Sequence, residues 1–363
     1  MAAFTLAEVR ERTCKTRDSW WTVWMVDPLA LRLVRLVANR TSITPSQLTT
    51  AALLFGLGAA ACFAFGWWQL LVLGAVLYYA CFLLDCMDGK LARLTDSESL
   101  FGSWMDYVFD RFRVLVCAIA LMGGQYVATG EVLFVWLALV VVFLDMLRYL
   151  NALQVYKIRR EMRSHVAGVL ERARATLSML EPADPAAEPI GPEGAGRPMS
   201  DAGEQAVLRH GISVLDQMLR TQMERESRSD RDAGKQPDVR LPKVDLHKEF
   251  RDRFPWYQWF WEFLRVRRVR THLVSGIEFQ AAVFIIAPLA GAVAPGAIAW
   301  ITIPMGVLLI AFEVAIVYKL WLSTHDFFRV VDGIEGALNL TRPSAGADRA
   351  ESAAGGSSQA TLG

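Results

Sequence analysis

The sequence of 363 residues has almost no net charge, +1, and contains few cysteines. No two of its five cysteines form a Cys-x-x-Cys pair and four lie in apolar segments, so we expect neither a disulfide nor a zinc site. The first residues carry charges but no apolar run that ends in a cleavage site, so we expect no cleavable signal peptide. Apolar residues are abundant, however: 53% of the chain is hydrophobic, which indicates a membrane protein.

Six apolar stretches are long enough to cross a bilayer core, which requires about 20 residues of helix. We therefore predict an all-α integral membrane protein with six transmembrane helices. The predicted spans are Gln47–Gly66, Gln69–Met87, Trp104–Met122, Val132–Ala152, Leu273–Val293 and Ala297–Leu320.

Lysine and arginine are absent from three short links between these spans and abundant at the opposite ends. By the positive-inside rule, both termini and the long loop after the fourth span lie in the cytoplasm. We expect a multi-pass protein of the plasma membrane.

The remaining segments divide the chain into five parts. Residues 1–46 form a cytoplasmic N-terminus with an amphipathic helix from Asp27, which we place in the membrane interface, although packing on a partner is an alternative. Residues 47–156 hold the first four spans, residues 157–272 a cytoplasmic insert, residues 273–322 the last two spans, and residues 323–363 a largely disordered tail. We interpret the insert as a loosely ordered appendage with two moderately helical stretches, Glu161–Leu180 and Gly203–Arg228.

The insert ends in an aromatic and basic segment, which we interpret as a second interfacial helix. Aromatics beside arginines could also stack on nucleic acid. Because the segment adjoins a span, we favour the membrane and expect no nucleic-acid partner.

Four aspartates lie where charge is costly, at the cytoplasmic ends of two successive spans. Asp85 and Asp88 end the second span, and Asp106 and Asp110 open the third at helical spacing. Such carboxylates repel one another unless cations lie between them, and oxygen ligands suit Mg²⁺ or Mn²⁺, of which we expect two ions. The alternative is buried ion pairing, which is as plausible as a functional role for Asp145 and Arg148 on the fourth span.

Small residues and one arginine accompany these aspartates. Gly89, Ala92 and Gly102 leave room for a ligand near the backbone. The planar guanidinium of Arg93 can donate two hydrogen bonds to a phosphate group. Together with metal ions, they describe a pyrophosphate site. In-line displacement at phosphorus between two metal ions also needs a base for the incoming hydroxyl.

The pattern Asp85-x2-Asp88-Gly89-x2-Ala92-Arg93-x8-Gly102-x3-Asp106-x3-Asp110 resembles, at all eight positions, the motif D-x2-D-G-x2-A-R-x8-G-x3-D-x3-D of the CDP-alcohol phosphotransferases. The resemblance covers residues 27–156 and 273–322 and excludes the insert. It implies metal ligation by Asp85, Asp88 and Asp106, and a general base at Asp110 that is also a ligand. Gly89, Ala92, Arg93 and Gly102 would line the CDP site.

The resemblance further implies a homodimer that transfers a phosphatidyl group, with CDP-diacylglycerol as the expected donor, to an acceptor hydroxyl and releases CMP in phospholipid synthesis. From the positive-inside rule we expect the active site to face the cytoplasm. The acceptor is left open. Six cations could bind an acceptor phosphate, although the positive-inside rule explains them equally well: Arg111, Arg113, Arg148, Lys157, Arg159 and Arg160. Glu278 and Glu313 could bind acceptor hydroxyls or pair with Lys319.

Three alternatives remain. One is a soluble CDP-alcohol donor with a lipid or polyol acceptor. Another is a divalent-cation transporter, although the outer halves of the second and third spans are nearly free of polar groups. A third is a non-catalytic membrane scaffold.

Overall fold

The computed structural model describes residues 4–15, 17–180, 206, 209–217, 219–220, 267–269, 274–294 and 296–340. These residues form helices, with one isolated bridge between Asp18 and Val269, and no strand occurs among them. Apart from residues 267–269, the aromatic and basic end of the insert lies outside the described residues, as does the tail beyond residue 340.

The N-terminal segment contains two helices and a π-helical turn. The helix α1 spans Leu6–Thr13, the turn η1 Thr22–Val26, and α2 Asp27–Arg40. The predicted helix from Asp27 is thus present, and it packs against the long helix α4 through a buried side that includes Leu31 and Val34. Its place in a membrane interface stays a prediction.

Six helical segments among the described residues are long and apolar enough to cross a membrane, as predicted. The fifth joins α10, the π-helical turn η2 and α11 into one run, Gly276–Val293. The other five are α3 (Pro45–Ala64), α4 (Trp68–Leu94), α5 (Leu100–Thr129), α6 (Leu133–Leu180) and α12 (Ala297–Leu340).

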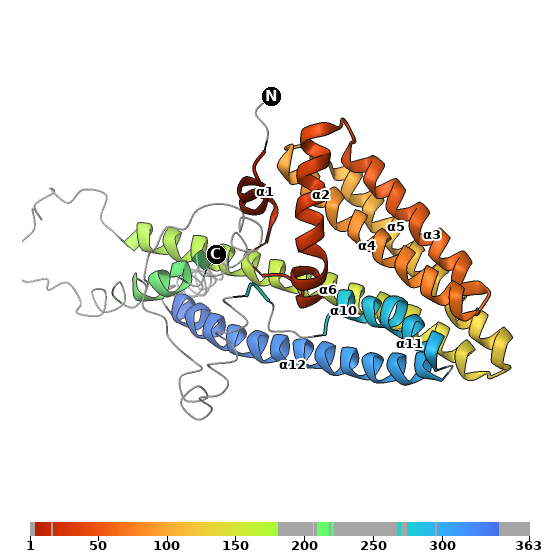
Figure 1. Cartoon of the computed structure of the whole chain (residues 1–363). Coiled ribbons are helices and arrows are strands. Elements are labelled where there is room, and N and C mark those ends of the chain that lie inside the picture. The colour runs from red at the N-terminus through yellow and green to blue at the C-terminus, as the bar shows by residue number, and fades with distance from the viewer. Residues whose placement is uncertain are drawn as a thin grey trace, which may run out of the picture. The chain divides into compact units, whose positions relative to one another are not determined.

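Small residues let these helices approach closely. The helix α3 lies beside both α4 and α5 (Figure 1). At Gly124 of α5, an added Cβ would collide with the carbonyl oxygens of Phe63 and Ala64, so glycine is needed where α5 meets the end of α3. The helix α4 also contacts α1, α2, η2 and α11. These contacts hold the helix that carries the first two motif aspartates.

Two helices continue beyond their predicted ends. The helix α6 runs to Leu180, so the boundary predicted at residue 156 lies inside a helix, and α12 runs to Leu340. Residues 323–340 are therefore helical, and their assignment to a largely disordered tail is wrong. The apolar core of the second unit explains the extension, because Val331 is fully buried there.

The chain divides into two compact units, residues 1–153 with 227–316, and residues 154–226 with 317–363. The second unit has its own apolar core of described residues: Met162, Val166, Val169, Leu170, Leu215 and Val331. This core shows that described residues of the insert between 158 and 219 pack around buried apolar side chains, where the sequence predicted a loosely ordered appendage.

Candidate active site

A short turn places the two halves of the motif at the same end of their helices. The helix α4 ends at Leu94, with the Thr95 hydroxyl donating to the Leu91 carbonyl at 2.9 Å. The helix α5 begins after Ser99, whose Oγ accepts a hydrogen bond from the backbone N–H of Gly102 at 2.9 Å. The last turns of α4 and the first turns of α5 therefore meet.

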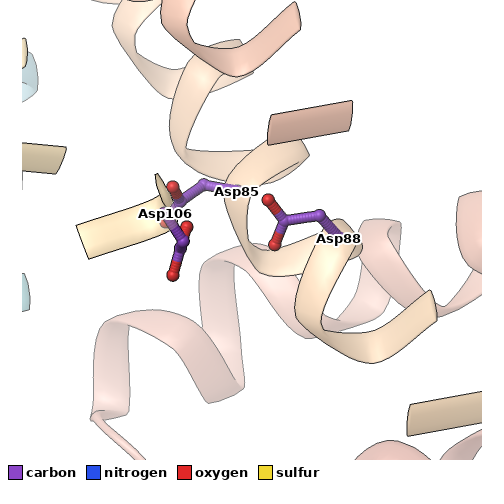
Figure 2. A group of neighbouring side chains, drawn as sticks. All are labelled: Asp85, Asp88 and Asp106. Carbon is purple, nitrogen blue, oxygen red and sulfur yellow. The ribbon is translucent and has the colours of Figure 1, made fainter. Parts of the chain in front are cut away.

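Three of the four aspartates converge. One carboxylate oxygen from each of Asp85, Asp88 and Asp106 lies within 4.8 Å of the other two (Figure 2). Asp88 is buried, and the buried Oδ1 of Asp106 has no hydrogen-bond partner in the described part of the chain. Converged carboxylates with an unsatisfied oxygen are the ligands that a hard divalent cation takes, so this donor set fits Mg²⁺ or Mn²⁺.

A threonine from α3 supports the cluster. The hydroxyl of Thr49 donates to Oδ2 of Asp88 at 2.5 Å, and Thr49 is itself buried. Sequence reasoning missed this residue. The available signal was weak, because a threonine in an apolar span also satisfies its hydroxyl on its own helix, and Thr49 lies 3.1 Å from the Pro45 carbonyl.

Asp110 lies outside this group of three and pairs with two arginines. Its Oδ1 forms an ion pair with Arg113, and its Oδ2 lies 3.7 Å from Nη2 of Arg111. Arg113 also reaches Oδ1 of Asp85, with its Nη1 at 3.2 Å. Arginine thus joins Asp110 to the cluster, and the roles of Asp110 as base and ligand stay predictions.

Arg111 belongs to a second buried network beside the cluster. It forms an ion pair with Asp145, which is 2% exposed and also accepts a hydrogen bond from Nε2 of Gln280 at 2.9 Å. The Arg111 guanidinium lies over the Tyr149 ring, 5.5 Å from its centroid. Asp145 therefore has partners on α5 and α10, and its pairing with Arg148 stays a prediction.

These contacts bear on the predicted acceptor site. Arg111 and Arg113 bind carboxylates of the protein itself, which leaves less of their charge for an acceptor phosphate. Glu278 accepts from the N–H and hydroxyl of Ser275 in a capping box at the start of α10. Glu313 accepts a hydrogen bond from Asn151 on α6. Both glutamates thus have structural partners.

The predicted phosphate-binding side of the motif is open. Gly89 is exposed, and a Cβ there would meet only Nη2 of Arg93, at 3.9 Å. The buried Nε of Arg93 has no hydrogen-bond partner among the described residues. Ala92 is half-buried, and a Cβ at Gly102 would lie 2.8 Å from Ser99 Oγ, so the helix start also explains that glycine. Gly89 and Arg93 could therefore accept a phosphate group.

Comparison with known proteins gives one family. Residues 42–181 match the family described as CDP-alcohol phosphatidyltransferase. No curated protein matches the sequence significantly. The matched region contains all eight motif residues and the helices α3, α4, α5 and α6. The match to the CDP-alcohol phosphatidyltransferase family over residues 42–181 therefore confirms the resemblance drawn from the motif.

Proposed function

We propose that this protein transfers a phosphatidyl group from CDP-diacylglycerol to an acceptor hydroxyl and releases CMP. Its family implies a transferase that moves phosphoalcohol groups in lipid synthesis. The observation that carries the proposal is the convergence of Asp85, Asp88 and Asp106 inside the matched region, with oxygens within 4.8 Å of one another.

The residues of the chain take separate parts in this reaction. Asp85, Asp88 and Asp106 would hold Mg²⁺ or Mn²⁺, with Asp110 a further ligand in the two-ion arrangement that we propose. When bound, the metal supplies positive charge against the charge that develops on the phosphate oxygens. The Arg93 guanidinium binds a phosphate oxygen, and the open backbone at Gly89 lets the pyrophosphate approach.

Asp110 takes the proton of the acceptor hydroxyl in this scheme. The acceptor oxygen then forms a bond to the phosphorus that carries the diacylglycerol, and the bond from that phosphorus to the CMP oxygen breaks. CMP leaves with the electron pair. Arg113 holds one oxygen of Asp110, so the other oxygen is the one that we assign to the proton.

The surface beside the site favours a lipid donor over a soluble CDP-alcohol. Leu100 and Phe101, at the start of α5, are 95% and 70% exposed, and Phe101 stacks on Trp104 with ring centroids 5.8 Å apart. Exposed aromatics at a helix end are typical of a membrane interface. Gly102 and Asp106 lie among these residues, so a donor with acyl chains in the bilayer could reach them.

We also propose that the protein is a homodimer in the plasma membrane and that this site faces the cytoplasm.

The test is CMP release by the purified protein in lipid vesicles, with Mg²⁺ or Mn²⁺ and a panel of acceptor alcohols. We expect metal-dependent release from CDP-diacylglycerol and none from the Asp88→Asn variant. Release from CDP-choline or another soluble donor alone would reassign the donor. No release from any donor, together with no binding of CDP by folded protein, would contradict the proposal and favour a cation site or a scaffold.

A further inference from the structure

Arg113 forms a bridge between two motif aspartates on different helices. Its side chain is 3% exposed, with Nη1 at 3.2 Å from Oδ1 of Asp85 on α4 and Nη2 paired with Oδ1 of Asp110 on α5. Nη1 also lies 3.2 Å from Sγ of Cys81. Arg113 is not one of the eight motif positions, so its role does not follow from the family match.

The surroundings of Arg113 hold its guanidinium in this position. On α3, a Cβ added to Gly56 would lie 2.7 Å from Cδ of Arg113, so the arginine stem fits closely against a residue that has no side chain. The guanidinium carbon is 5.9 Å from the centroid of the buried Tyr78 ring. Because the aliphatic part of the side chain is closely packed and the guanidinium contacts an aromatic ring, the guanidinium has little freedom to rotate away from the two aspartates.

We propose that Arg113 is a positioning residue that fixes Asp110 relative to the metal-binding aspartates. This inference rests on the proposed function. Arg113 takes one oxygen of Asp85 and one of Asp110 and does not occupy the second oxygen of either carboxylate, although Oδ2 of Asp110 also lies 3.7 Å from Nη2 of Arg111. The positive charge of Arg113 lies between the carboxylates of Asp85 and Asp110 and offsets the repulsion between them. Lysine could not replace it, because an ammonium group lacks the planar fork that spans two carboxylates.

The experiment separates chemistry from metal binding. Arg113→Met protein in vesicles is assayed for kcat and donor KM, and Mn²⁺ binding is measured by electron paramagnetic resonance without substrate. We expect kcat to fall about 100-fold because the base is misplaced, while donor KM changes less than about threefold. Mn²⁺ should bind about tenfold more tightly, because a cation next to the ligand Asp85 is removed. General loss of structure would weaken metal binding instead.

A second variant tests the bridge without removing its charge. Gly56→Ala places a methyl group against the Arg113 stem and should shift the guanidinium, lowering kcat about tenfold while the protein still binds Mn²⁺. Gly58→Ala is the matched control on the same helix, because a Cβ there would lie at an ordinary 3.6 Å from Leu77. We expect Gly58→Ala to retain the wild-type kcat.

Two results would overturn the positioning role. One is a wild-type kcat in folded Arg113→Met or Gly56→Ala protein. The other is Mn²⁺ binding by Arg113→Met that is no tighter than in the wild type. If Arg113→Met does not fold, the comparison of Gly56→Ala with Gly58→Ala decides. Wild-type protein that binds Mn²⁺ but releases no CMP from any donor would contradict the proposed function, and the Mn²⁺ affinity of Arg113→Met would still test the bridge.

Discussion

Lys90 and Asp27 form a buried ion pair that joins the motif on α4 to the first residue of α2. Nζ of Lys90 lies 2.9 Å from Oδ1 of Asp27, and the two side chains are 6% and 8% exposed. Nη1 of Arg268 lies 4.0 Å from the other oxygen of Asp27, and the Arg268 carbonyl accepts from the N–H of Asp18 at 2.8 Å. The N-terminal segment and the chain before the fifth span therefore meet beside the motif.

The first prediction concerns the strength of this pair. Asp27→Asn leaves the Lys90 ammonium buried without its carboxylate and should lower the free energy of unfolding by about 3 to 5 kcal/mol. The double variant Asp27→Asn with Lys90→Met removes both charges and should recover much of that loss. Thermal unfolding in a mild detergent measures both effects.

An exposed pair supplies the control. Lys157 and Glu161 lie 4.0 Å apart on α6 and are 69% and 67% exposed, so Glu161→Gln should cost less than about 1 kcal/mol. If Asp27→Asn unfolds at the same temperature as Glu161→Gln, the buried pair does not hold α2 to α4.

The second prediction distinguishes Asp110, the proposed base, from Asp88, a proposed metal ligand. Asp110→Asn should abolish turnover but keep metal-dependent CDP binding, because Asp85, Asp88 and Asp106 remain. Asp88→Asn should lose both turnover and binding, because it removes a carboxylate from the converged set. Turnover and CDP binding are measured on the same preparation.

The control for both variants is Asp96→Asn in the turn between α4 and α5. Asp96 is exposed and has φ 50°, a conformation that asparagine adopts readily, so this change should keep full activity. Turnover by Asp110→Asn at the wild-type rate would remove Asp110 from the role of base.

The third prediction concerns the hydroxyl on Asp88. Thr49→Val keeps the shape of the side chain but deletes the hydrogen bond to Asp88, so Mn²⁺ affinity should fall about 10-fold or more. Thr49→Ser should retain most of the affinity. Thr50→Val is the matched control, because the Thr50 hydroxyl is exposed and bonds the Ser46 carbonyl of its own helix. Equal Mn²⁺ affinities in Thr49→Val and Thr50→Val would show that this contact does not support the metal ligands.

The sequence predicted the helices and the approach of the aspartates, of which three converge, from the lengths of the spans and the spacing of residues on a helix. Apolar length predicts a span, and i+4 spacing places Asp106 and Asp110 on one stripe of a helix. The structure brings Asp106 to Asp85 and Asp88. Which residues hold the metal and which is the base stay predictions.

Long-range partners could not be predicted in the same way. Asp145 binds Arg111 and Gln280, which are 34 and 135 residues away, and a contact of that kind depends on how helices pack and turn. Thr49 reaches Asp88 across 39 residues for the same reason. For α6, the sequence indicated a span and a separate helical stretch at Glu161–Leu180 but not that the two form one helix, and for α12 it predicted a tail where the helix continues. An apolar core buries one side of both continued helices.

The last prediction concerns the insert. Leu215 is fully buried in the core of the second unit, so Leu215→Ala should lower the stability of that unit by about 2 to 5 kcal/mol. CMP release should be unchanged, because the converged aspartates and Arg93 belong to the first unit. Ser213→Ala, at an exposed position in the same helical stretch of residues 209–217, should change neither property. Hydrogen exchange measures the local stability, and the CMP assay measures activity.

Loss of CMP release in Leu215→Ala, at a temperature where the first unit is folded, would show that the second unit takes part in catalysis. Deletion of residues 182–236 should likewise leave CMP release largely intact, and loss of folded protein or of turnover on that deletion would show that the insert belongs to the catalytic unit.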